Sequence, residues 1–285
     1  MEKLVLASEG VFPVVKDMHG NTIKDQPQTG LLMPGTIQGE GKLAGVPSLF
    51  IRLSSCNLRC IWQMNDGSFC RCDTTYASFH PDKTQEIEVD NIIDWLKHNL
   101  GAIRHVVITG GEPLLQKKPL ASLCKKIKEE LNLHITLESN GTLFDETVAQ
   151  WVDLFSISPK LSNSVPSAEK LAHYNLKESG PFKFHGERRL NLNALQAYID
   201  LCNRSDKELQ LKFVIGKTDD YKEVKTDFLN KLNDYKNNDI LLMPLGATQE
   251  EIAKSAPLVL EMAIANGWRY SPRVHIDLFG SKQGV

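Results

Sequence analysis

Four of the six cysteines lie close together, at Cys56, Cys60, Cys70 and Cys72. Disulfides are unusual in a reducing cytoplasm, where a tight group of cysteines more often indicates metal or redox chemistry. Thiolates from a short loop hold iron–sulfur clusters, and three ligands leave one iron open to a small molecule. The alternative is a structural zinc site with four cysteines, but such sites usually consist of two C-x2-4-C pairs.

Three further short motifs carry glycine or polar side chains directly after predicted strands. They are Gly110-Gly111-Glu112-Pro113, Ser139-Asn140-Gly141 and Ser158-Pro159-Lys160. Cys56 follows an earlier predicted strand in the same way. Because ligands collect at the carboxyl ends of parallel strands, these motifs predict one site assembled from four successive strand ends.

Strand-like and helix-like stretches alternate from about residue 48 onward, and this alternation predicts the fold. Strands are expected over 48–53, 104–109, 134–138, 154–158, 209–215, 240–243 and 274–278. Helices are expected over 89–100, 119–131, 145–152, 190–203, 220–235 and 248–266. Repeated β–α units imply an α/β fold with parallel strands, either an open wound sheet or a complete or partial barrel.

The chain of 285 residues is long enough for one large domain or two small ones. Residues 1–30 show little periodicity and are expected to be an N-terminal extension, and 31–285 a single domain. The polar stretch 160–190 receives no assignment. Cys124 and Cys202 fall on apolar helix faces and are expected in the core.

Composition excludes several classes of function. A net charge of −2 predicts no binding of nucleic acid. No apolar run approaches the roughly 20 residues that a membrane span needs. The N-terminus, beginning Met1-Glu2-Lys3-Leu4, lacks the features of a signal peptide, so a cytoplasmic location is expected.

Two segments resemble the halves of the radical S-adenosylmethionine (SAM) signature C-x3-C-x2-C: Cys56-Asn57-Leu58-Arg59-Cys60 and Cys72-Asp73-Thr74-Thr75-Tyr76. Gly110–Pro113 resembles that superfamily's SAM-binding motif. More narrowly, the chain over about 33–285 resembles the 7-carboxy-7-deazaguanine synthase family. That resemblance rests on motifs in the family's order, at 36–41, 47–53, 138–142, 158–160, 273–275 and 280–285.

The resemblance implies a partial (β/α) barrel of the radical SAM type. It implies a carbon–nitrogen lyase that converts 6-carboxy-5,6,7,8-tetrahydropterin to 7-carboxy-7-deazaguanine in queuosine (deazapurine) biosynthesis. A SAM-derived radical would take a hydrogen atom from C6, and the ring would contract with loss of ammonia. The implied cofactors are a 4Fe–4S cluster, SAM and magnesium. The alternative is another small radical SAM enzyme, such as a glycyl-radical activase.

The cluster loop departs from the family pattern, because about nine extra residues, Gln63 to Arg71, separate Trp62 from Cys72. The resemblance implies Cys56, Cys60 and Cys72 as ligands. Cys60 is the preferred middle ligand since it keeps the C-x3-C spacing. Cys70 is the alternative, because family members with expanded loops take this ligand from near the third cysteine.

The resemblance also implies the remaining site residues. SAM would contact Arg71, Asp73, Gly111, Glu112, Ser158, Pro159 and Lys160. The pterin would contact Ile37, Gln38, Gly39, Arg52, Thr109 and Val285, and magnesium would bind Thr74. Glu40 and His275 are further candidates for the pocket, although His275 also fits an ordinary strand end.

Arg52 has support from the residue pattern as well. It alternates with Ile51 and Leu53 on a predicted strand, so its side chain faces away from theirs. In a barrel that face is the interior, where a guanidinium suits a substrate carboxylate, whereas the alternative is an exposed arginine. The resemblance finally implies a homodimer and an electron donor such as flavodoxin or ferredoxin.

Overall fold

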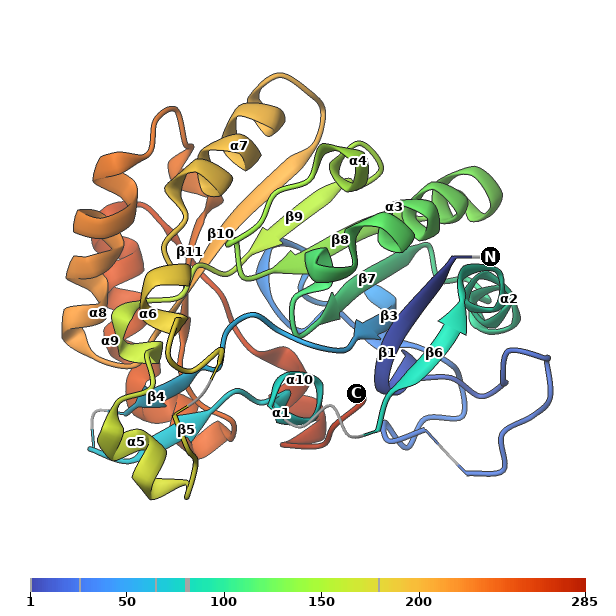
Figure 1. Ribbon diagram of the computed structural model, residues 1–285, viewed down its shortest axis with the longest axis horizontal. Helices are drawn as coiled ribbons and strands as arrows, with labels where there is room; N and C mark the ends of the chain where they lie inside the picture. Colours follow the sequence, from blue (N-terminus) through green and yellow to red (C-terminus); the bar gives the residue numbers. More distant parts are fainter. Residues whose placement is uncertain (1, 26, 65, 80–82, 179) are drawn as a thin grey trace.

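The computed structural model of the chain describes residues 2–25, 27–64, 66–79, 83–178 and 180–285. One large sheet runs through it in the order β12-β11-β10-β9-β8-β7-β3-β1-β6, with β2 paired to β3 (Figure 1). Its strands are β1 Lys3–Phe12, β2 Thr36–Ile37, β3 Pro47–Leu53, β6 Gln85–Glu88, β7 His105–Gly110, β8 His134–Ser139, β9 Leu154–Ile157, β10 Glu208–Ile215, β11 Ile240–Pro244 and β12 Arg269–Tyr270. A separate hairpin contains β4 Ile61–Gln63 and β5 Phe69–Arg71.

From β3 to β12 the neighbouring strands are parallel and follow one another in chain order. Antiparallel β1 and β6 continue the sheet beyond β3, and the strand order does not close on itself. The result is a partial β/α barrel, as the alternation of strands and helices predicted.

The longer helices lie on one side of the sheet, and the short ones lie mostly on the other (Figure 1). The outer side carries α2 Val89–Asn99, α3 Lys117–Lys126, α4 Glu146–Ala149, α7 Leu192–Asn203, α8 Thr218–Glu223 and α9 Gln249–Asn266. The cluster-loop helix α1 Thr75–Ser78 and the C-terminal helix α10 Val274–Phe279 lie across the opposite face. The stretch 160–190, which had no assignment, contains two short helices, α5 Ala168–His173 and α6 His185–Arg188.

Strand alternation separates the core from the site. On β3, Leu49, Ile51 and Leu53 are fully buried against the outer helices. Arg52 and Phe50 point to the inner face and line a cavity. The same alternation holds along the other parallel strands, so the outer layer forms the apolar core and the inner layer is largely polar. Cys124 and Cys202 are buried in that core, as expected.

Two segments differ from the sequence-based expectations. Residues 1–30 were expected to be an extension, whereas Lys3–Phe12 form β1, paired with both β3 and β6 inside the sheet. The predicted last strand over 274–278 is wrong, because those residues form helix α10. The Val274 N–H donates to the Gly39 carbonyl at 2.9 Å. This bond ties the start of α10 to the N-terminal loop that contains Gly39, and not to a neighbouring strand.

No helix among the described residues is long and apolar enough to cross a membrane.

A buried histidine at the start of β7 makes stability depend on pH. His105 is 3% exposed, and its ring nitrogens lie 2.7 Å from Ser48 Oγ and 2.8 Å from Thr136 Oγ1. The pKa of His105 is lowered to about 4. Burial is the main cause and the nearby His134 ring acts in the same direction, while Asp153 opposes the shift. Below its ordinary pKa of 6.5 the unfolded chain binds a proton at this site and the folded chain does not.

We therefore expect the unfolding free energy to fall between pH 6.5 and about 4, by up to about 1.4 kcal/mol per pH unit from His105. Urea unfolding at pH 6.5 and 4.5 measures this slope, and the variant His105→Asn should flatten it. Exposed His19 gives the control, since His19→Gln should leave the slope as it is. Equal slopes in wild type and His105→Asn would show that His105 does not cause the loss.

Candidate active site

A cavity of about 390 Å³ opens at the carboxyl ends of the parallel strands, between the inner face of the sheet, the cluster loop and the C-terminal segment. Its size is within the range of small-molecule sites. Most residues predicted from the sequence line it: Ile37, Gln38, Gly39, Arg52, Cys56, Cys60, Arg71, Cys72, Asp73, Thr74, Thr109, Gly111, Ser158, Lys160 and Val285. Two predicted residues, Glu112 and Pro159, are not among the lining residues.

The cluster loop runs from β3 to α1, and the three thiols preferred as cluster ligands line this cavity, as Cys70 does. Cys56 follows β3, Cys60 precedes β4, and Cys72 follows β5. Strands β4 and β5 form a hairpin in which Trp62 pairs with Cys70. The hairpin closes at its base, where the Cys72 N–H donates to the Cys60 carbonyl at 3.2 Å. The extra residues of the loop are thus folded out as a hairpin, and Cys60 and Cys72 become neighbours.

The surroundings of the thiols are apolar. A small buried group packs against them, made of Leu58, Trp62, Met64 and Leu245. Burial raises the pKa of Cys56 to about 12 and that of Cys60 well above its ordinary value, and charge on Cys72 acts on both in the same direction. Such thiols become thiolates when a metal takes the place of the proton.

Helix α6 holds the cluster loop from outside. The Arg59 N–H donates to His185 Nδ1 at 3.0 Å, and His185 Nε2 lies 3.1 Å from Ser164 Oγ. The Arg59 guanidinium donates to the Cys56 carbonyl at 2.6 Å. His185 is fully buried, and burial lowers its pKa to about 3, so the ring is neutral and accepts the Arg59 N–H.

The arrangement of the thiols favours one of the two metal sites that the spacing allowed. Within the described ranges, no three His, Cys, Asp or Glu side chains gather closely enough to hold a single ion. A four-cysteine zinc site needs such a gathering. In an iron–sulfur cluster each thiolate binds a different iron atom, so its ligands stand further apart. Three thiols on one cavity wall fit the cluster.

The glycine motif after β7 lines the cavity at Gly110 and Gly111 and also makes room for the cluster loop. A Cβ on Gly111 would lie 2.1 Å from the Ser55 carbonyl oxygen and 2.8 Å from Cys56 Cβ, so only glycine lets the cluster loop pass. The Glu112 carboxylate accepts from the Ser139 hydroxyl at 3.0 Å and from the Asn140 N–H at 2.8 Å. Glu112 is fully buried and supports the Ser139–Asn140 turn behind the cavity, so the structure does not bring it to the lining.

Residues after the end of β9 and in the cluster loop complete this part of the cavity. Lys160 Nζ donates to Ser158 Oγ at 2.7 Å, and its charge acts on the Cys60 thiol. Across the cavity, Thr74 Oγ1 lies 3.2 Å from Cys72 Sγ. The Arg71 guanidinium lies over the Tyr174 ring, 4.6 Å from its centroid. Hydroxyl and ammonium groups therefore surround the position beside the three thiols.

Arg52 projects into the cavity from the inner face of β3, as alternation predicted. Its Nε is buried and makes no hydrogen bond, and no salt bridge joins the guanidinium to a carboxylate of the described residues. A buried N–H without an acceptor is costly, and a guanidinium that has no carboxylate partner among the described residues suits an anionic group of a ligand.

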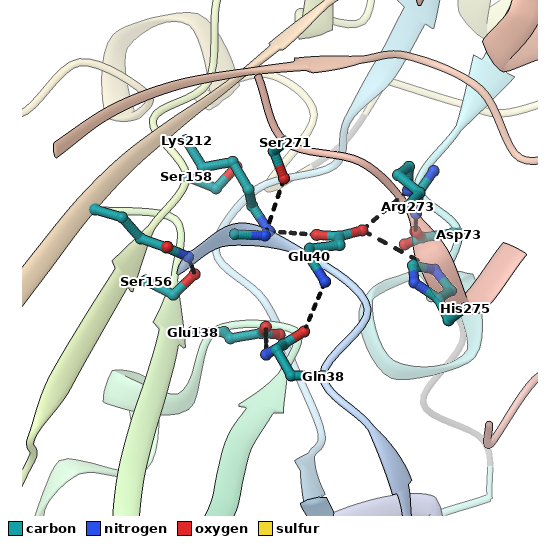
Figure 2. A network of polar contacts seen from close by, with 12 residues as sticks. Gln38, Glu40, Asp73, Glu138, Ser156, Ser158, Lys212, Ser271, Arg273 and His275 are labelled. Carbon is teal, nitrogen blue, oxygen red and sulfur yellow. Dashed lines mark hydrogen bonds and ion pairs between the residues drawn. The ribbon is translucent and has the colours of Figure 1, made fainter. Parts of the chain in front are cut away.

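A chain of ion pairs crosses the cavity floor beside it (Figure 2). Glu40 pairs with Lys212 of β10 and accepts from Arg273 Nε at 2.9 Å, and Arg273 Nη2 donates to Asp73 at 2.9 Å. Burial alone would raise the pKa of Glu40, but Lys212 and Arg273 hold it well below its ordinary value. The N-terminal loop, β10, the cluster loop and α10 are thus fastened to one another by charge.

The loop over residues 38–41 is held by contacts within the protein. The Gln38 side chain donates to Glu138 at 3.1 Å and accepts from the Glu40 N–H at 3.1 Å, so its amide is used within the protein. A Cβ on Gly39 would lie 2.0 Å from His275 Nδ1, so this glycine admits helix α10. His275 lines the cavity and lies on α10, not at a strand end.

Sequence reasoning did not assign roles to several inner-face residues that line the cavity, namely Glu138, Ser156, Lys212 and Met243. The signal was present in the strands themselves. Lys212 is a charged residue within the buried β10 pattern, and Glu138 is a charged residue near the end of β8. A charge inside a buried parallel strand indicates an ion-pair partner or a ligand.

Comparisons with known proteins agree with this geometry. Residues 51–162 match the model of the Radical SAM superfamily. The chain is 35% identical to the 7-carboxy-7-deazaguanine synthase of Rhodopirellula baltica, over 87% of this chain and 85% of that protein. It is 36% identical to the synthase of the same name from Halobacterium salinarum, over 86% and 87%.

The crystal structure of QueE from Escherichia coli has the same fold, with a TM-score of 0.55 at 23% identity, covering 93% of this chain and 95% of that one. These relatives do not support the alternative of a glycyl-radical activase. The thiols that line a strand-end cavity and the partial barrel agree with these matches, which extend along most of the chain. The chain therefore belongs to the 7-carboxy-7-deazaguanine synthase family of radical SAM enzymes.

Proposed function

We propose that this cavity binds 6-carboxy-5,6,7,8-tetrahydropterin and converts it to 7-carboxy-7-deazaguanine with loss of ammonia. The observation that carries the proposal is the position of Arg52, which lines the cavity, has a buried Nε that makes no hydrogen bond, and suits the carboxylate that distinguishes this pterin. Glu138 lies on the same inner face, and its carboxylate suits the amino and ring N–H donors of a pterin. Thr109 and Ile37 lie along the cavity wall, and Val285 at the chain terminus closes it.

Cys56, Cys60 and Cys72 would hold the 4Fe–4S cluster, and Ser158, Lys160 and the Gly111 backbone would hold SAM beside it. When bound, this pair supplies one-electron chemistry that activates a C–H bond of the substrate. Lys160 would neutralise the SAM carboxylate. The apolar group around the thiols keeps water away from the reacting centre.

Arg71 and Asp73 would complete the SAM pocket from the cluster loop, while Glu112 and Pro159 would shape it from behind. We propose magnesium at Thr74, whose hydroxyl faces the cavity. Magnesium takes few protein oxygens and otherwise water or substrate oxygens, so one hydroxyl together with a substrate carboxylate fits its preference. An electron donor such as flavodoxin or ferredoxin, a homodimer and a cytoplasmic location stay predictions from the family resemblance and the sequence.

The reaction is tested by anaerobic incubation of the reconstituted protein with SAM, a reductant, magnesium and 6-carboxytetrahydropterin. Mass analysis should find 7-carboxy-7-deazaguanine, formed together with ammonia and only when all components are present. If deoxyadenosine forms while the pterin is unchanged, the substrate is a different molecule although the radical chemistry stands. Omitting magnesium should slow product formation, which separately tests the proposed metal.

A further inference from the structure

Strand β1 lies beside the substrate cavity, although it precedes every motif that the family resemblance uses. It pairs with β3 so that Val11 faces Ile51 and Phe12 faces Phe50. The register shifts between Leu6 and Val11, and the residues between them bulge opposite Arg52. Phe12 therefore stands on the same face of the sheet as Phe50 and diagonally next to Arg52.

Two aromatic rings flank the guanidinium of Arg52. Its Cζ lies 4.9 Å from the centroid of Phe12 and 5.8 Å from that of Tyr76. Phe12 is itself fixed by a stacked contact with Phe50, with centroids 5.4 Å apart and planes inclined by 22°. Phe12 is 5% exposed and is not among the residues that line the cavity, so the ring is a buried neighbour of Arg52 and not a surface group.

Stacked rings hold a guanidinium without using its N–H groups. An aromatic face attracts the cation through its quadrupole and carries no strong acceptor for the N–H donors, which lie in the plane of the guanidinium. This explains how Arg52 is fixed in place while its buried Nε makes no hydrogen bond. The N–H edge remains available for a planar carboxylate, which accepts two parallel hydrogen bonds.

We propose that Phe12 is a positioning residue for substrate recognition, which holds the Arg52 guanidinium so that its N–H edge meets the carboxylate of the ligand. The inference rests on the proposed function, since it assigns to Phe12 a part in binding the pterin carboxylate. The N-terminal segment thereby belongs to the substrate site. A Cβ built on Gly284 would lie 3.5 Å from Glu9 Cγ, so the C-terminal tail also passes close to the β1 bulge.

The test compares two ligands in the holoenzyme with SAM, under anaerobic conditions, by calorimetry. The probes are 6-carboxypterin and pterin, which differ only in the carboxylate. Phe12→Leu should weaken 6-carboxypterin about fivefold and leave pterin unchanged, because a cation–π contact of ordinary strength is lost. Phe12→Tyr keeps the ring and should retain most of the difference in affinity between 6-carboxypterin and pterin. Phe12→Met replaces Phe12→Leu in the comparison if the leucine variant folds poorly.

Two controls separate positioning from general damage. Phe228 is fully buried in an edge-to-face contact with Phe213 and is not among the residues that line the cavity, so Phe228→Leu should change neither affinity. In an Arg52→Met background, adding Phe12→Leu should have no further effect on 6-carboxypterin, because both changes act on one interaction. Equal weakening of both ligands by Phe12→Leu, or additive effects in the double variant, would overturn the proposal. If the wild type does not distinguish the two ligands, the proposed substrate carboxylate itself fails.

Discussion

Cys60→Ala should leave the protein without its iron–sulfur cluster, whereas Cys70→Ala should retain it. The structure supports this expectation through the hairpin. Its base joins Cys60 to Cys72, whereas Cys70 lies within β5, two residues before Cys72 and opposite Trp62. Glu251, Asp73, Arg273 and Cys72 act on the Cys70 thiol, whereas Lys160, Cys72 and Cys56 act on the Cys60 thiol. Cys60 therefore shares its surroundings with the other two ligands.

The measurement is iron and sulfide content after anaerobic reconstitution, together with visible absorbance and the electron paramagnetic resonance spectrum of the reduced protein. Each variant should be compared at equal folded concentration by circular dichroism. Cys202→Ala is the matched control, because Cys202 is a buried core thiol remote from the cavity. A Cys70→Ala protein without cluster, beside a Cys60→Ala protein that retains it, would reverse the assignment.

Arg52→Lys should reduce kcat/KM for the carboxylated pterin by on the order of 100-fold or more. Lysine keeps the charge but loses the planar pair of N–H donors. It also loses the contacts that the guanidinium makes with the rings of Phe12 and Tyr76. Removing one side of a buried, hydrogen-bonded charge pair costs about 2–5 kcal/mol, which corresponds to a loss of roughly 30-fold to several thousand-fold and includes the expected value. Slow cleavage of SAM in the absence of pterin should continue, since Arg52 is placed at the substrate and not at the cluster.

Steady-state assays of product and of deoxyadenosine, run side by side, check this prediction. Arg204→Lys is the matched control, because Arg204 is an exposed arginine far from the cavity lining. Loss of SAM cleavage together with product formation would place Arg52 in cluster or SAM binding. Unchanged kcat/KM in Arg52→Lys would mean that another group binds the carboxylate.

Periodicity along the chain was sufficient for most of the fold. The alternation of apolar strands and amphipathic helices predicted the parallel strands from β3 to β11 and the covering helices in the right order. It failed at 274–278, where Val274, Ile276 and Leu278 alternate like a strand. There the Val274 N–H bonds to Gly39, a residue at the other end of the chain, and a short helix forms. It also gave no sign that residues 3–12 pair with β3, because their pattern is broken by the bulge.

The chemistry of the site follows from residue types that are readable in the chain: three thiols spaced for an iron–sulfur cluster, glycines at strand ends and an arginine on an inner strand face. How these groups are arranged depends on contacts between distant residues. The hairpin brings Cys60 to Cys72, the Ser139–Asn140 turn takes Glu112 away from the cavity, and Lys212 and Arg273 converge on Glu40. Local patterns encode the secondary structure and the face on which a side chain lies. They do not encode which buried charge meets which partner, because that is set by packing between segments as much as 233 positions apart.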